Sequence, residues 1–193
     1  MLPSLPGPRH CVIGFTAHHV IAADIDEDVV RHRLDPADLS QPMSATFLTF
    51  LAGWLGADPG PIDVVFVGPP IERADDSLEL WRRTDLDTHP RVARAGRYRP
   101  DIAVYGDRQQ GEPDGLLIVG RGVADRWEMA YEVEPHARGR GLGRRLAAAA
   151  AALVPNGERV FAQVSPGNVA SIRACLAAGY VPIASEVLFS PTS

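Results

Sequence analysis

A glycine-spaced turn that carries arginines has the composition of a phosphate-binding loop. Its residues are Arg138, Gly139, Arg140, Gly141, Leu142, Gly143 and Arg144. Glycine allows the backbone to approach a ligand closely, and the N–H groups in the first turn of a helix have no intrahelical partner. The alanine-rich segment after the turn is expected to form that helix. These N–H groups, the positive end of the helix dipole and the arginine side chains together suit a pyrophosphate.

The spacing of the glycines separates three classes of phosphate loop. A dinucleotide fingerprint needs glycine where this chain has Arg144, and a Walker loop needs lysine, whereas all 19 basic residues here are arginine. An acyl-CoA loop is compatible with the spacing. A tight turn that only packs against the rest of the protein is the plain structural alternative.

Two motifs in this chain resemble those of the GCN5-related N-acetyltransferase (GNAT) superfamily. The segment Arg138–Gly143 is similar to the family's Gln/Arg-x-x-Gly-x-Gly/Ala signature, and Tyr131–Pro135 resembles the end of the family's fourth strand, where a bulge splays the neighbouring strands. Downstream, Asn168–Tyr180 resembles the family's Asn-x-x-Ala/Ser helix. The resemblance covers residues 115–189 and implies a mixed α/β acyl-CoA acyltransferase fold, with a central bulged sheet, flanking helices and an N-terminal extension.

The resemblance also implies a function and a donor site. An N-acetyltransferase moves an acetyl group from acetyl-CoA, its co-substrate, to a primary amine by direct attack, and it needs no metal. In this chain the backbone of residues 139–144 would bind the CoA pyrophosphate, and the N–H near Val133 would polarise the thioester carbonyl. Asn168 would bind the pantetheine arm, and capping of its own helix is an equally good interpretation.

A general base must deprotonate the amine, because an alkyl ammonium has a pKa of about 10. Glu128, Glu132 and Glu134 alternate onto one face of the strand expected over residues 126–134. Partial burial raises the pKa of a carboxylate toward the range that a base needs. We predict Glu132 as the catalytic base, with Glu128 second. A polar sheet face without a catalytic role is the alternative.

The chain departs from the family pattern at two positions. Where many members have a tyrosine that protonates the leaving thiolate, this chain has Cys175, which can act as a general acid or fill the core as a small buried residue. Where members that act on protein N-termini often carry glutamate, this chain has Gln163. Its amide can form hydrogen bonds but cannot act as a base.

Hydrophobic periodicity and turn residues predict the remaining elements. In the first half, strands are expected within 11–23 and at 62–67, and helices from Asp24, over 44–55 and over 75–83. Residues 91–99 carry four arginines and are expected to form a basic connector, which is either solvated or in contact with the acyl donor or the acceptor. In the second half, strands are expected at 101–105, 116–121, 126–134, 159–164 and 181–189, and helices over 142–154 and from 168 to Gly179. Residues 1–95 would complete the sheet and the acceptor pocket of an acetyl-CoA-binding core at 96–193, within one domain.

Composition limits the class of protein further. A chain of 193 residues that is 46% hydrophobic can bury a full core, and its net charge of −5 gives no basic field for nucleic acid. Cys11 and Cys175 lack metal-ligand spacing, so no metal site is expected, and a reducing cytoplasm is the expected location. No apolar segment reaches the roughly 20 residues of a membrane span. A small-molecule or peptide amine is the expected acceptor, bound by a monomer or a homodimer.

A second class of function is an acyl-CoA-binding sensor or interaction module that keeps the donor site without turnover. The cysteine at position 175 and the unassigned first half of the chain favour it. The acceptor of the enzyme stays open between polyamine, amino acid, antibiotic and peptide N-terminus. Acidic clusters at 24–28 and 75–79 suit a cationic amine, but surface acidity is too common to choose between these classes.

Overall fold

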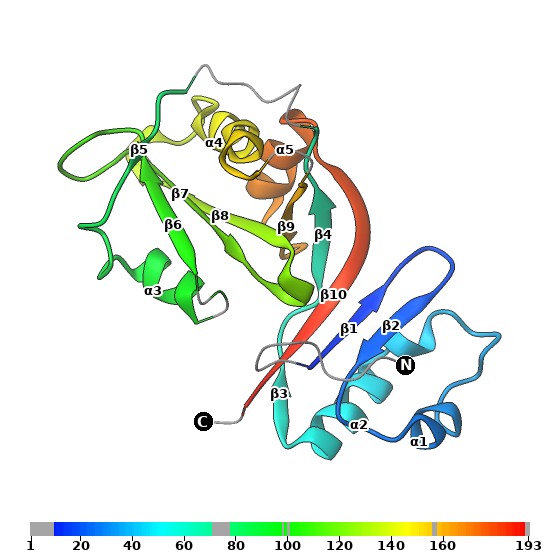
Figure 1. Cartoon of the computed structure of the whole chain (residues 1–193). Coiled ribbons are helices and arrows are strands. Elements are labelled where there is room, and N and C mark those ends of the chain that lie inside the picture. Colours follow the sequence, from blue (N-terminus) through cyan, green and yellow to red (C-terminus); the bar gives the residue numbers. More distant parts are fainter. Residues whose placement is uncertain (1–9, 71–77, 98, 100, 156–157, 192–193) are drawn as a thin grey trace. The chain divides into compact units, whose positions relative to one another are not determined.

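A computed structural model describes residues 10–70, 78–97, 99, 101–155 and 158–191. The chain forms two compact units (Figure 1). Unit 1 consists of Met1–Val65 and Ile183–Ser193, and unit 2 consists of Phe66–Pro182. Each unit has its own arrangement of strands and helices, so the two are described separately. The proline-rich residues 1–8 lie outside the described residues.

Unit 1 pairs a small antiparallel sheet with one long helix. Its elements are β1 (His10–Gly14), β2 (His19–Ala22), α1 (Glu27–Arg31), the 3-10 turn η1 (Gln41–Met43), α2 (Ala45–Leu55), β3 (Ala57–Pro59) and most of β10 (Val181–Pro191). Strand β1 pairs with β2 on one side and β10 on the other, and β3 also pairs with β10. The strands predicted within 11–23 and the helix predicted over 44–55 are confirmed.

Helix α2 begins and ends where its sequence provides caps. The hydroxyl of Ser44 accepts a hydrogen bond from the N–H of Phe47, and Gly56 ends the helix with a φ of 58°. The apolar face of α2 packs into the core of unit 1 through Phe47, Leu48 and Leu51. The side chain of Trp54, near the end of the same helix, is 51% exposed.

Unit 2 contains a mostly antiparallel sheet and the three helices around it. Its elements are β5 (Trp81–Arg82), α3 (Pro90–Gly96), β6 (Ile102–Gly106), β7 (Gly115–Arg121), η3 (Val123–Asp125), β8 (Trp127–Val133), η4 (Pro135–Ala137), α4 (Leu142–Ala150), η5 (Ala151–Leu153), β9 (Val160–Val164) and α5 (Val169–Ala177). Strand β4 (Asp63–Val67) spans the boundary between the units. The strands run in the order β9-β8-β7-β6-β5, with β8 and β9 parallel and the other pairs antiparallel.

The two faces of this sheet carry different helices (Figure 1). On one face, α3 packs through Val92 and Ala95 on a cluster that includes Ile118 of β7 and Ala130 of β8. On the other face, α4 and α5 cover the residues of opposite parity, and the alanine-rich side of α4 is buried. The strand β8 therefore contributes even-numbered side chains to the α3 face and odd-numbered side chains to the α4/α5 face.

Two predicted elements of unit 2 were wrong. Residues 75–83 were expected to be helical, but Trp81–Arg82 form the strand β5, and residues 75–77 lie outside the described part. Residues 91–99 were expected to be a basic connector, but most of them form α3, and Arg99 is 8% exposed. The predicted stop of α5 at Gly179 is confirmed by its φ of 85°.

Candidate functional site

The strands β8 and β9 are joined over only part of their length. Their parallel register consists of Trp127 opposite Val160 and Glu128 opposite Phe161. Strand β8 nevertheless stays paired with β7 up to Val133, and this register runs without an inserted residue. The predicted bulge is therefore absent from the β7–β8 ladder, and β8 instead parts from β9 after Glu128. Between residues 129 and 133 the backbone edge of β8 that faces β9 has no partner strand in the described part of the chain.

The predicted phosphate cradle, residues 138–144, lies directly beyond this open edge. Gly139 and Gly141 have φ values of 76° and 77°, and a Cβ atom on either would meet nothing within 4 Å. Gly141 is the N-cap of α4, and no side chain caps the helix. The N–H groups of the first turn of α4 thus have no side-chain cap, and the exposed residues Arg140 and Arg144 lie on either side of the start of the helix.

Two contacts hold the cradle against β8. The Nε atom of Arg138 donates a hydrogen bond of 2.9 Å to the carbonyl oxygen of Val133. A Cβ atom on Gly143 would lie 3.3 Å from the ring of Tyr131 and 3.7 Å from the Cβ of Ala174 on α5. The cradle is therefore packed between the end of β8 and α5.

Asn168 acts as the N-cap of α5. Its side-chain oxygen accepts a hydrogen bond of 3.1 Å from the N–H of Ser171. The capping interpretation of Asn168 is thus confirmed. This bond uses one of the two lone pairs of the Oδ1 atom, so capping is compatible with a further contact of the same side chain.

Glu128, the second predicted base, is held by four hydrogen-bond donors. Its carboxylate accepts bonds from Arg99 Nε at 3.0 Å and Arg126 Nε at 2.9 Å. It also accepts bonds from Gln163 Nε2 at 2.6 Å and from the N–H of Val123 at 3.2 Å. Three of these bonds are to Oε1, and the bond from Arg99 is to Oε2. At 3% exposure, Glu128 is an internal carboxylate engaged by its neighbours.

Gln163 extends this Glu128 network across the point where the strands part. It lies on β9, two residues beyond the last pair with β8, and its Oε1 atom accepts a bond of 3.4 Å from Arg99 Nη2. Side chains therefore join β8 and β9 where backbone bonds stop. A Cβ atom on Gly122 would lie 2.2 Å from the carboxyl group of Glu128, so the network also requires glycine at that position.

Glu132 lies on the same face of β8 as Glu128, in the splayed part of the strand. It is half-buried, and its carboxylate has no hydrogen bond or ion pair within the described part of the chain. The half-buried Arg91 of α3 lies near enough to Glu132 for this carboxylate to favour the charged form of the Arg91 guanidinium. In the sequence, Arg91 belongs to the arginine run at 91–99, for which a solvated face and a contact with the donor or the acceptor were both open.

Cys175 and Tyr131 form a protonated cluster on the opposite face of β8. Cys175 is fully buried, and burial raises the pKa of its thiol to about 11. Burial also raises the pKa of Tyr131, whose hydroxyl approaches Ser171 without reaching hydrogen-bond geometry with any described residue. Both groups keep their protons at neutral pH. The interpretation of Cys175 as a small buried core residue is confirmed.

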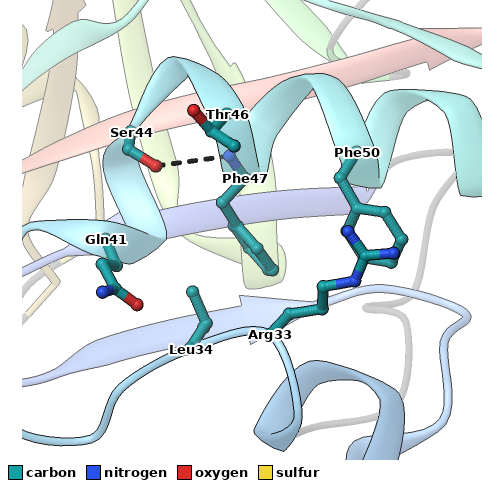
Figure 2. A pocket seen from close by; sticks show the side chains of 7 residues that line it. All are labelled: Arg33, Leu34, Gln41, Ser44, Thr46, Phe47 and Phe50. Atoms are coloured by element: carbon teal, nitrogen blue, oxygen red, sulfur yellow. Dashed lines mark hydrogen bonds between the residues drawn. The ribbon is translucent and has the colours of Figure 1, made fainter.

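Unit 1 contains a hollow of about 340 Å³ that no sequence motif indicated. Figure 2 shows its lining residues, which are Arg33, Leu34, Gln41, Ser44, Thr46, Phe47 and Phe50. The guanidinium of Arg33 lies 4.1 Å from the centre of the Phe50 ring. The prediction that residues 1–95 shape the acceptor pocket stays a prediction.

Comparison with protein families finds one match that covers more than half of the chain. Residues 73–180 match the Acetyltransferase (GNAT) family. The chain belongs to this family. The match includes β8, the cradle and α5, so this member has the cradle of the family motif beside an open strand edge. No curated protein matches the sequence.

Three solved structures show how far the likeness extends. A GNAT-family acetyltransferase from Novosphingobium aromaticivorans is 21% identical over 70% of this chain, with a TM-score of 0.49. A GCN5-related N-acetyltransferase from Kribbella flavida is 17% identical over 76%, with a TM-score of 0.49. A Drosophila protein is 20% identical over 77%, with a TM-score of 0.51. The chain spans 66%, 64% and 58% of these three proteins, respectively.

Within the described residues of this GNAT member, no helix has the length and apolar character needed to cross a membrane. Nor do three or more His, Cys, Asp or Glu side chains gather there in an arrangement suited to a metal ion.

Proposed function

We propose that this chain is an N-acetyltransferase that takes its acetyl group from acetyl-CoA. The observation that carries the proposal is the continuity of an uncapped, glycine-lined helix start with the open edge of β8. A pyrophosphate suits the N–H groups of residues 142–144, and an extended amide-bearing arm suits the unpaired backbone between 129 and 133. The edge of β8 leads into the start of α4, just as the pantetheine arm of CoA leads into its pyrophosphate.

The reaction places three demands on the residues around this path. The amine nitrogen attacks the thioester carbonyl carbon, the C–N bond forms, and negative charge develops on the carbonyl oxygen. A backbone N–H near Val133 is the proposed donor to that oxygen. The C–S bond then breaks, its electron pair leaves on the sulfur as the CoA thiolate, and the amine loses one proton to a base.

Glu132 is the proposed base. Of the two predicted glutamates, it is the one whose carboxylate accepts no hydrogen bond from a described residue, whereas the buried Glu128 accepts four. Glu132 also lies beside the open edge of β8, on the α3 face, while the cradle is packed against the α4/α5 face. This arrangement lets an amine approach from the α3 side of the strand.

Calorimetric titration with acetyl-CoA tests the donor site, and release of free CoA thiol in the presence of amines tests turnover. We expect binding in the micromolar range and thiol release that depends on the amine. Absence of heat at high micromolar acetyl-CoA would contradict the donor site. Binding without amine-dependent thiol release, over a broad panel of amines, would instead indicate the acyl-CoA sensor.

A further inference from the structure

The α3 face of the splayed end of β8 carries two opposite charges that are not joined. The Nε atom of Arg91 is buried and has no hydrogen-bond partner in the described part of the chain. Glu132 on β8 has no ion pair there either, and the two side chains do not form one with each other. A guanidinium and a carboxylate thus lie near enough for their charges to interact, but too far apart to form an ion pair.

Arg91 is in an environment that opposes its charge. Burial is the main cause that lowers its pKa, the charges of Arg94 and Arg99 lower it further, and Glu132 acts in the opposite direction. The nearby Arg99 is already occupied, because its Nε atom bonds to Glu128. A half-buried guanidinium without an acceptor costs stability, so proteins usually provide such a group with an anion. Here no described residue supplies it.

We infer that Arg91 binds the carboxylate of the acceptor, and that the acceptor is an amino acid or another amine that carries a carboxylate. This inference rests on the proposed function and names its substrate class. The amino group lies toward Glu132, the proposed base, and the carboxylate lies toward the accessible part of the Arg91 side chain. Such a zwitterion matches both charges and fills the gap between them.

The charges around Arg91 also argue against other acceptors. A polyamine would bring a second cation toward three arginines, which costs free energy in a half-buried site. A phosphate-bearing amine would need several donors for its three oxygens, whereas Arg94 is exposed and Arg99 is engaged by Glu128. A carboxylate needs only one guanidinium, and arginine matches its planar geometry.

The test compares L-amino acids with their C-terminal amides as acceptors, at saturating acetyl-CoA, by release of free CoA thiol. We expect the wild-type protein to favour the acids in kcat/KM by at least about tenfold, as a charge-assisted bond provides. Arg91→Ala should remove most of this preference by raising the KM of the acids, with little change for the amides. Arg91→Lys should restore part of it. The amino groups of an amino acid and of its amide differ in basicity, but this difference is the same for every variant. The change in the acid-to-amide ratio between variants is therefore independent of it.

Arg82→Ala provides the matched control, because Arg82 is an exposed arginine of the same unit, on β5. It should leave the acid-to-amide ratio unchanged. Arg91→Ala should not lower the melting temperature, since it removes a buried charge that has no partner. A wild-type preference for putrescine, for 2-aminoethyl phosphate or for the amides would overturn the inference, and so would an equal loss on acids and amides in Arg91→Ala. Failure of every amine, with acetyl-CoA bound, would contradict the proposed function itself.

Discussion

Strand β8 carries one glutamate near each end, on the same face, and the two side chains lie in opposite surroundings. At the end that pairs with β9, Glu128 is 3% exposed and accepts four hydrogen bonds. At the end that parts from β9, Glu132 is half-buried and its carboxylate has no partner in the described part of the chain. The pairing of β8 with β9 therefore separates a carboxylate held by four hydrogen bonds from one that no described residue engages.

The largest expected effect is a loss of stability when Glu128 is removed, at the end of β8 that pairs with β9. Glu128→Ala would leave Arg99 buried beside Gln163 without its anion, and the loss of one partner of a buried ion pair typically costs about 3–5 kcal/mol. Urea denaturation should show this loss in the free energy of unfolding. The double variant Glu128→Gln/Gln163→Glu keeps one carboxylate and one amide in the network, and should recover part of the stability. Full stability of Glu128→Ala would show that the network is not structural.

The splayed end should show the reverse pattern. Glu132→Gln removes the proposed base but breaks no described bond, so thiol release at saturating amine should fall by about a hundredfold. Its unfolding free energy should stay within about 0.5 kcal/mol of the wild type. Binding of acetyl-CoA, measured by calorimetry, should be unchanged. Retention of full activity in Glu132→Gln would remove Glu132 from the mechanism.

The sequence was a good guide to features made by neighbouring residues. The cradle, the N-cap of α5 and most strands depend on local spacing, and each of these elements was predicted. The Glu128 network was not predicted, because Arg99 and Gln163 lie 29 and 35 positions away from Glu128 in the chain. Periodicity shows which face a glutamate occupies, but the pairing of strands decides which glutamate finds donors. The same limit explains why residues 91–99 were taken for a connector.

The cradle provides a smaller effect that concerns the donor alone. Gly141→Ala places a Cβ in open space but at a φ of 77°, where a side chain costs about 1–2 kcal/mol. We expect about a tenfold weaker affinity for acetyl-CoA by calorimetry, because relaxation of this strain moves the N–H groups of α4. Gly53→Ala is the matched control. Gly53 is on the exposed side of α2 with open space around it, so alanine there should stabilise the protein by about 0.5–1 kcal/mol without changing donor affinity.

The smallest effect concerns Cys175, on the face of β8 opposite the two glutamates. Its thiol has a pKa of about 11 in the folded protein against 9.0 for an exposed cysteine. Between these values the unfolded chain loses the proton first, so the folded state binds more protons and stability falls as pH rises. Relative to Cys175→Ala, the wild-type protein should lose about 1 kcal/mol of unfolding free energy between pH 8 and pH 10. Parallel curves for the two proteins would mean that the thiol ionises at its ordinary pKa, and would place a thiolate, rather than a core residue, beside Tyr131.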